Sequence, residues 1–318
     1  MFKKMFAHIL LLLVGVFAGA CSIVFIRTST LNPILLAAYR MLAAGCILLP
    51  VFFRQLKKAN LRLTFSLVKP SILPGLLLGL HFIFWNYGAG HTTAANGTLL
   101  VNMVPVVMPF FAYFLFREVI NIPELVGTML ALGGITVLGI SDFQVSRTTF
   151  LGDISCFVAA VFAAAYLALS RKNNRGESIW IYMVPLYLVG GVFTFLISLF
   201  FTSPAANISL KNILMFLGLA CISTIVGHTI FNLSMRRLRS QLVTLINLMQ
   251  IVYGALLGYF FFSEIPSSRF FIAFPIVLGG TVLTIIFFFR CVTIENSGAA
   301  GEERPAPQPG SRSGNPKT

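Results

Sequence analysis

The sequence predicts an all-α integral membrane protein, with ten transmembrane helices arranged as two inverted five-helix repeats. Three observations predict this fold class: an apolar composition, ten apolar segments of membrane-spanning length, and a repeat within the chain. Hydrophobic residues make up 57% of the 318 residues and charged residues 10%, whereas soluble domains carry about 25% charged residues. The composition therefore places most of the chain in a lipid bilayer.

The internal repeat is clearest around one aromatic segment. Tyr113–Glu118 (Tyr-Phe-Leu-Phe-Arg-Glu) returns 146 residues later as Tyr259–Glu264 (Tyr-Phe-Phe-Phe-Ser-Glu). These segments divide the chain into one unit at 1–145 and a second at 150–292, followed by a Gly-, Pro- and Ser-rich tail at 293–318 that we expect to be disordered and cytoplasmic. The same offset pairs Asn86 with Asn232, Thr98 with Thr244, Met103 with Met249, and Leu132-Gly133-Gly134 with Leu278-Gly279-Gly280.

Each predicted helix is an apolar segment long enough to cross the bilayer. A hydrocarbon core about 30 Å thick needs roughly 20 helical residues. Five such segments fall in each repeat, and their approximate ranges are 6–26, 33–53, 71–88, 94–116, 123–141, 152–170, 179–201, 211–232, 240–262 and 270–290. We number these segments as spans one to ten.

The first span also has features of a signal peptide. Lys3 and Lys4 precede the apolar run, and Ala18–Cys21 resembles a lipoprotein cleavage site. Cleavage there would remove one span from the first repeat and destroy its match to the second. We therefore expect this segment to be retained as a membrane helix.

Basic residues predict the direction of the spans. With a cytoplasmic N-terminus, fifteen Lys and Arg residues fall in the inside loops, and only Arg27, Arg147, Lys211 and Arg269 fall outside. The positive-inside rule then places both termini in the cytoplasm. Because each repeat has an odd number of spans, the second repeat enters the membrane upside down, which is typical of transporters.

Several function classes are not supported by the sequence. The five cysteines are scattered and form no Cys-x-x-Cys pair, so we expect neither a disulfide framework nor a metal site. The net charge of +14 comes from short basic loops and is not accompanied by any nucleic-acid-binding module. The chain lacks a phosphate-binding Gly-x4-Gly-Lys loop, a Gly-x-Ser-x-Gly elbow and a His-Glu-x2-His helix. We therefore expect no cofactor, no nucleic-acid partner and no enzymatic activity.

Residues 1–292 resemble the drug/metabolite transporter superfamily, and more closely the bacterial EamA-type ten-span exporters. The two repeats depart from each other where Ile251 replaces Pro105 and where Leu186 stands near the position of Arg40. The resemblance implies a secondary transporter of the inner membrane that exports amino acids or related metabolites, with a cavity lined by spans one, three, four, six, eight and nine. It rests on Arg40, Pro105–Glu118, Gly133-Gly134, Gly152-Asp153, Glu264 and Gly279-Gly280.

Arg40 is the permanent charge that lies well inside a predicted span. It comes eight residues after Asn32, or about 12 Å from the outer end of that helix. An arginine at such a depth is costly. It can reach outward to the surface, bond carbonyls of a neighbouring helix, take part in gating, or serve as the counter-charge for a substrate carboxylate.

Two histidines occupy equivalent spans of the two repeats. His81 lies in span three, with Trp85 four residues later, and His228 lies in span eight, with Thr224 and Asn232 four residues to either side. Residues four apart share a helix face, so we expect both faces to line the cavity. Each imidazole can either carry a coupled proton or remain neutral and bonded across helices.

Amides and prolines mark spans four and nine. Asn102 in span four, and Asn247 and Gln250 in span nine, offer donors and acceptors for a polar solute, or equally for contacts between helices. Pro105 and Pro109 should kink span four. By contrast, Glu118 and Glu264 end their spans, where capping or loop anchoring is expected.

The sequence therefore predicts a transporter that acts on a small molecule within the bilayer. Its predicted substrate-binding residues are Arg40, His81, Trp85, Asn102, Thr224, His228, Asn232, Asn247 and Gln250. Protons are a candidate coupling ion, and because no carboxylate lies deep in a span, the histidines or a protonatable substrate would have to carry them. The alternatives are an importer of a nucleoside-like, amine or vitamin-like metabolite, a non-transporting membrane protein, and an intramembrane lipid enzyme. Glycine-rich spans five and ten would suit a homodimer contact as well as a monomer.

Overall fold

The computed structural model describes residues 2–92, 94–139, 147–174, 178–265, 268 and 270–301, and no strand occurs among them. Eight of its helices are long and apolar enough to cross a membrane, and two shorter apolar helices, Ile122–Gly134 and Phe274–Phe287, occupy the places of spans five and ten. The predicted all-α membrane fold with ten helices is therefore confirmed.

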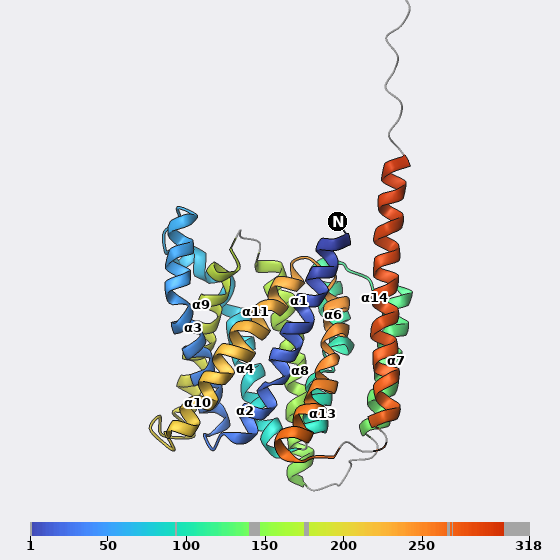
Figure 1. The fold of residues 1–318 in the computed structure, drawn as a ribbon. Coiled ribbons are helices and arrows are strands. Elements are labelled where there is room, and N and C mark those ends of the chain that lie inside the picture. The colour runs from blue at the N-terminus through green and yellow to red at the C-terminus, as the bar shows by residue number, and fades with distance from the viewer. Residues whose placement is uncertain are drawn as a thin grey trace, which may run out of the picture.

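The ten spans follow the predicted order, and four of them are interrupted (Figure 1). Spans one, four, eight and nine consist of two or more helical pieces, whereas the others are single helices. The elements are α1 (Phe2–Ala20) and α2 (Ser22–Thr28) in span one, α3 (Pro33–Lys58), α4 (Phe65–His91), α5 (Ala94–Val101) and α6 (Val104–Phe116) in span four, α7 (Ile122–Gly139), α8 (Arg147–Asn173), α9 (Ile179–Ser198), α10 (Leu210–Gly218), the π-helix η1 (Leu219–His228) and α11 (Thr229–Met235) in span eight, α12 (Ser240–Asn247) and α13 (Met249–Phe262) in span nine, and α14 (Phe270–Gly301).

Successive spans run in opposite directions across the bundle (Figure 1). We call the end at which α1 begins the N-terminal end, and the opposite end the far end. The first repeat therefore starts at the N-terminal end and the second, with α8, at the far end, so the repeats are inverted. The expected tail at 293–318 overlaps the last turns of α14, and its remaining residues, 302–318, lie outside the described residues.

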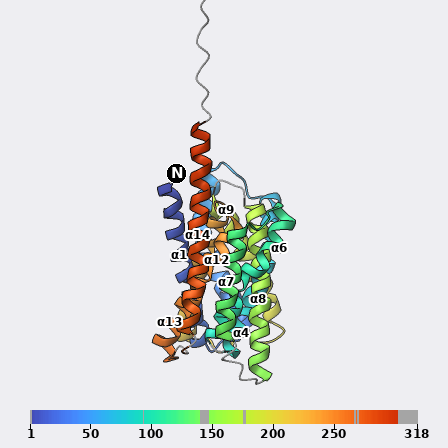
Figure 2. The same cartoon turned by 90° about the vertical axis from the view of Figure 1, so that its right-hand side faces the viewer.

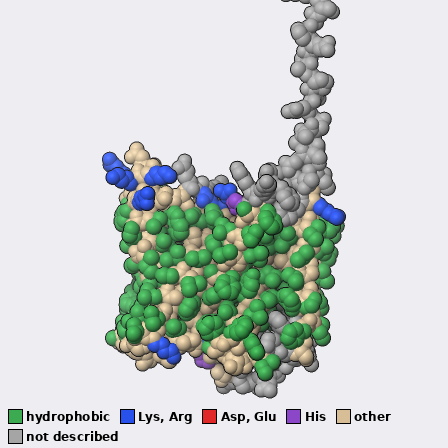
Figure 3. Space-filling model, in the orientation of Figure 1, with side chains coloured by type: hydrophobic (Ala, Val, Ile, Leu, Met, Phe, Trp, Pro, Cys, Tyr) green, Lys and Arg blue, Asp and Glu red, His purple; other side chains and the backbone are tan. Residues whose placement is uncertain are grey.

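The lateral surface of the bundle is apolar. Figure 3 shows hydrophobic side chains across the middle of one face, with Lys and Arg side chains gathered mainly along the N-terminal end. Large apolar side chains such as Phe110, Phe260 and Leu196 are more than half exposed there, as expected for surfaces that face lipid tails rather than water.

Glycines allow spans of different repeats to approach closely. A Cβ added at Gly75 in α4 would lie 2.7 Å from the carbonyl oxygen of Leu186 in α9, so α4 and α9 pack nearly backbone to backbone. Similarly, a Cβ added at Gly127 would lie 2.8 Å from the carbonyl oxygen of Gly280. The latter contact joins α7 to α14, which form a pair at one side of the bundle (Figures 1 and 2).

The interruptions of spans four and nine are related by the repeat. Span four breaks at Asn102 and Met103, just before Pro105, whose missing N–H cannot complete the α-helical ladder. Span nine breaks at Leu248, which is 146 residues after Asn102, although Ile251 stands in place of the proline. Each break is a tight turn in which a backbone N–H bonds a carbonyl three residues earlier. A proline is therefore not required for this break.

Candidate functional site

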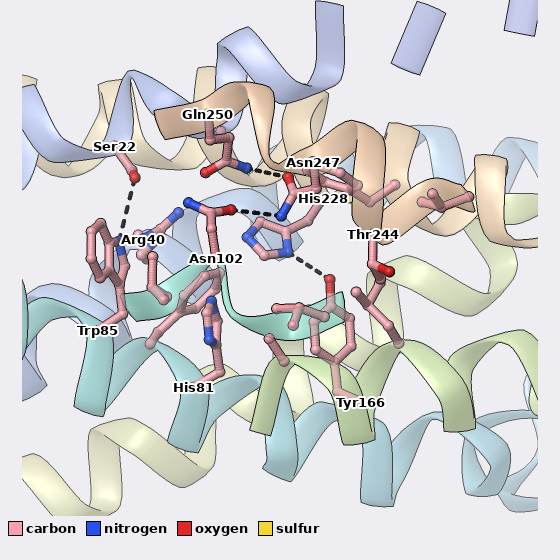
Figure 4. A pocket seen from close by; sticks show the side chains of 18 residues that line it. Ser22, Arg40, His81, Trp85, Asn102, Tyr166, His228, Thr244, Asn247 and Gln250 are labelled. Atoms are coloured by element: carbon pink, nitrogen blue, oxygen red, sulfur yellow. Dashed lines mark hydrogen bonds between the residues drawn. The ribbon is translucent and has the colours of Figure 1, made fainter. Parts of the chain in front are cut away.

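Spans four and nine meet at a cavity in the middle of the bundle, which we call the chamber (Figure 4). Its volume is about 50 Å³, enough for roughly three to five water molecules and far below the several hundred Å³ of a typical ligand pocket. Side chains from spans one, three, four, six, eight and nine line it, together with one residue of span two. The chamber is therefore contracted, and a solute larger than a few atoms would need it to expand.

One wall of the chamber is a chain of side-chain amides (Figure 4). Gln250 Nε2 donates to Asn247 Oδ1 at 2.6 Å, and Asn247 Nδ2 donates to Asn102 Oδ1 at 2.8 Å. The chain ends where Asn102 Nδ2 donates to the carbonyl oxygen of Thr98 at 2.7 Å. Because Asn102 precedes one helix break and Asn247 the other, this chain links the two repeats at their equivalent weak points.

Arg40 also lines the chamber, between Trp85 and Asn102 in the view of Figure 4. The Arg40 side chain is only 1% exposed, so it does not reach out to the surface. Its Nε donates to Thr224 Oγ1 at 3.0 Å, and its guanidinium carbon lies 3.8 Å from the centroid of the Phe82 ring. Its Nη1 has no hydrogen-bond partner among the residues that the structure describes.

The two histidines lie next to each other, with ring centroids 5.8 Å apart. The Nδ1 of His81 lies 2.8 Å from the carbonyl oxygen of Ala159. A carbonyl only accepts, so Nδ1 carries the proton and Nε2 is left as an acceptor. The Nδ1 of His228 lies 2.7 Å from the hydroxyl oxygen of Tyr166 in span six. Each histidine is thus held by a residue of span six.

Seven of the nine predicted site residues line the chamber: Arg40, His81, Trp85, Asn102, His228, Asn247 and Gln250. The Thr224 hydroxyl accepts a hydrogen bond from Arg40 Nε, and the Thr224 carbonyl oxygen accepts one from the Tyr187 hydroxyl. Asn232 turns back to the carbonyl of His228, to which its Nδ2 donates at 2.8 Å. Both therefore support lining residues instead of facing the chamber.

Other lining residues were not predicted, among them Ser22, Tyr166 and Thr244. The Ser22 hydroxyl accepts a bond from Trp85 Nε1 at 3.3 Å. Thr244 precedes Asn247 by three residues within α12, which places both on one helix face. The helical spacing around Asn247 could therefore have identified Thr244, whereas Ser22 begins α2 and has no predicted site residue within a turn of it.

Each end of the bundle carries one cluster of an arginine, a phenylalanine and a glutamate. At the N-terminal end, Arg171 Nη1 lies 2.6 Å from Glu118 Oε2, and the Arg171 guanidinium carbon lies 4.7 Å from the Phe116 ring centroid. At the far end, Arg27 pairs with Glu264 and lies 4.6 Å from the Phe262 ring centroid. We call these the N-terminal and far clusters.

The two clusters are copies related by the repeat. Phe262 and Glu264 stand 146 residues after Phe116 and Glu118, and each glutamate pairs with an arginine of the other repeat. The expected capping or anchoring role of these glutamates therefore needs correction. Their carboxylates bridge the repeats, joining spans four and six at one end of the bundle and spans one and nine at the other.

A second and larger cavity, about 380 Å³, lies at the N-terminal end of α4 and includes Leu61, Pro70 and Asn174 among its lining residues. It contains none of the nine predicted residues. In the described residues, no group of three or more His, Cys, Asp or Glu could hold a metal ion. The chamber is therefore the candidate site.

Comparison with known families gives one match, found twice along the chain. Residues 5–140 and again residues 150–286 match the EamA-like transporter family. A solved crystal structure covering 90% of this chain and 98% of its own shares the fold with a TM-score of 0.70, at 17% sequence identity.

Three curated relatives are transporters by name. The uncharacterized transporter YvbV of Bacillus subtilis is 28% identical over 173 residues, which is 54% of each protein. An uncharacterized transporter of Methanothermobacter thermautotrophicus is 21% identical over 82% of this chain and 81% of its own length. The pseudopaline exporter CntI of Pseudomonas aeruginosa is 22% identical over 80% of this chain and 84% of its own length.

Proposed function

Because the chain belongs to the EamA-like transporter family, we propose that it is a secondary transporter that exports a small polar metabolite, such as an amino acid or a related compound, by alternating access. The membrane would be the bacterial inner membrane, with both chain termini in the cytoplasm. The observation that carries the proposal is the pair of repeat-related clusters, one closing each end of a bundle with a single polar chamber between them.

The clusters give alternating access a physical basis. Each one joins a residue of the first repeat to a residue of the second, so a relative rotation of the repeats separates one pair while the other is kept. Breaking the far cluster would open the chamber outward, and breaking the N-terminal cluster would open it inward. In the present conformation both pairs are formed, and the chamber has a volume of about 50 Å³.

The lining residues favour a polar solute over a purely apolar one. The amide chain and the histidines place donors and acceptors at the middle of the bilayer, where unpaired polar groups are costly. The name of CntI supports export as the direction, whereas the geometry itself allows import as well. His81 and His228 are the proposed carriers of a coupled proton.

Accessibility labelling tests the proposal. Ser22→Cys and Thr244→Cys are nearly isosteric changes on different sides of the chamber, to be made in a chain whose five native cysteines have been replaced. A membrane-impermeant thiol reagent should label both positions from either side of sealed vesicles. Val106→Cys, at a half-exposed apolar position on span four, is the matched control and should stay unlabelled.

Flux provides the second measurement. Purified protein in proteoliposomes should carry at least one solute from a panel of amino acids, amines and nucleosides, and vesicles of known orientation give the direction. A chamber that can be labelled from one side only, under all conditions, together with no flux across the panel, would contradict alternating access and favour a non-transporting protein.

A further inference from the structure

Arg40 has a guanidinium nitrogen whose donors its protein environment does not use. Thr224 accepts from Nε, and the Phe82 ring covers the face of the guanidinium. These contacts explain the position of the side chain, but Nη1 is buried without any partner in the described part of the chain. Buried donors are nearly always paired, so an unpaired donor on the chamber wall indicates that a bound solute supplies the acceptor.

The charge of Arg40 is also uncompensated. None of the described residues that line the chamber is Asp or Glu. Three of the four acidic side chains that the structure describes are paired with arginines elsewhere. The fourth, Asp153, accepts a bond from Thr92 Oγ1 at 2.6 Å. A buried charge requires a counter-charge, and none of these four carboxylates supplies it.

We propose that the chamber binds its solute through a carboxylate, and that Arg40 is the residue that recognises it. This inference rests on the proposed transport function and specifies the substrate class. A single guanidinium neutralises a monoanion, whereas a phosphate monoester would keep about one excess negative charge in a chamber whose described lining includes no second Lys or Arg. A carboxylate therefore fits the charge of this site better than a phosphate does.

The rest of the lining indicates what the carboxylate is attached to. Trp85, Phe82 and Phe231 present aromatic surface to the chamber, and Val101 and Leu167 present aliphatic surface. No acidic group is available there for a second, cationic end of the solute. The fitting ligand is thus a compact carboxylic acid with an apolar or aromatic body, and any ammonium group would have to rest on the aromatic faces.

Matched acids and amides test the assignment directly. Purified protein would be titrated with benzoate, 3-phenylpropanoate and acetate, and in parallel with benzamide, 3-phenylpropanamide and acetamide. The ionic strength would be held constant with chloride, and the melting temperature would be followed. The acids should raise the melting temperature of the wild type and the amides should not, because an amide has the same shape but no charge.

Variants identify the residue responsible. Arg40→Met keeps an unbranched apolar stem, is shorter by the end of the guanidinium and removes the donors, so the apparent affinity for the acids should fall about 10- to 100-fold. Arg40→Lys restores the charge and should recover part of the loss. Arg62→Met removes an exposed loop arginine and should leave the titration unchanged.

The ligand-free melting temperature separates binding from structure. If Arg40 is held ready for a ligand, Arg40→Met should melt at the same temperature as the wild type or higher, because an uncompensated buried charge has been removed. If Arg40 only stabilises the fold, the variant should melt lower or fail to fold.

Four results would overturn the inference: shifts equal for acids and amides, no shift with any acid, acid binding that survives Arg40→Met, or a variant destabilised in the absence of ligand. Ser22→Cys and Thr244→Cys report access without reference to Arg40. Labelling from both sides with no preference for acids would reject the carboxylate site alone, whereas labelling from one side only under all conditions, together with no flux across the panel, would reject transport itself.

Discussion

Removing one end cluster should bias the transporter toward one open state. Glu264→Gln keeps the shape of the side chain and abolishes the ion pair with Arg27, while the N-terminal pair between Arg171 and Glu118 is untouched. Glu118→Gln does the reverse. Because the two pairs close opposite ends, the two variants should shift the conformational equilibrium in opposite directions.

The size of the shift follows from the exposure of the pairs. The side chains of the far pair are 25% and 34% exposed, and those of the N-terminal pair 23% and 17%. Partly exposed pairs contribute about 0.5–1 kcal/mol, and a shift of 1 kcal/mol changes an equilibrium roughly fivefold. The arginine–phenylalanine contacts stay in place, so they do not add to this difference.

Labelling rates of Thr244→Cys from each side of sealed vesicles measure the bias. Glu264→Gln should raise the rate from the far side about two- to fivefold and lower it from the N-terminal side. Glu118→Gln should give the opposite change with a smaller amplitude, because Arg239 of the second repeat still pairs with Glu124 of the first at that end. Exchanging the charges, as in Arg171→Glu with Glu118→Arg, should return the rates toward the wild type. Equal changes from both sides, or the same direction in both variants, would refute the assignment of the clusters as alternating closures.

Three further predictions concern packing, the amide chain and coupling. Gly75→Ala should lower the melting temperature by an amount equivalent to about 1–3 kcal/mol, because the added Cβ would lie 2.7 Å from a carbonyl oxygen of α9. The control Gly133→Ala, whose added Cβ would have nothing within 4 Å, should be neutral or stabilising in the same thermal scan. Asn102→Ala should cost about 1–3 kcal/mol of stability and reduce flux, because the Nδ2 of Asn247 loses its acceptor. Denaturant or thermal unfolding measures the stability, and proteoliposomes measure the flux. If neither changes, the chain of side-chain amides is dispensable. His228→Gln should remove the stimulation of flux by an imposed pH gradient if this histidine carries the coupled proton, and stimulation that persists would exclude that role.

Much of the fold could be predicted from the sequence, because spans depend on local composition. Apolar segments bounded by charged or Gly- and Pro-containing loops give the ten helices and their order. The offset of 146 residues gives the inversion. The break in span nine was beyond such reasoning, because Leu248 has no proline near it and the expected signal, Pro105, occurs in span four only.

The candidate site was predictable where helical spacing held. His81 and Trp85, four residues apart in the continuous helix α4, both reach the chamber. Thr224 and His228 are also four apart and lie in the π-helix η1, but only His228 lines the chamber. The Thr224 hydroxyl is instead taken up by Arg40 Nε, a contact between distant spans that helical spacing does not reveal. The partners of Arg27 and Arg171 depend on contacts between distant spans, 237 and 53 residues away along the chain, which no local pattern encodes.

The single buried guanidinium has a consequence for the ancestry of the chain. Two identical five-span subunits assembled head to tail would each contribute Arg40, and both positive charges would face one small space. In the fused chain, the position 146 residues later is Leu186, which is fully buried in the packing of α9. Joining the halves covalently therefore allowed one copy to keep the cation and the other to discard it, an asymmetry that is not accessible to a dimer of identical chains.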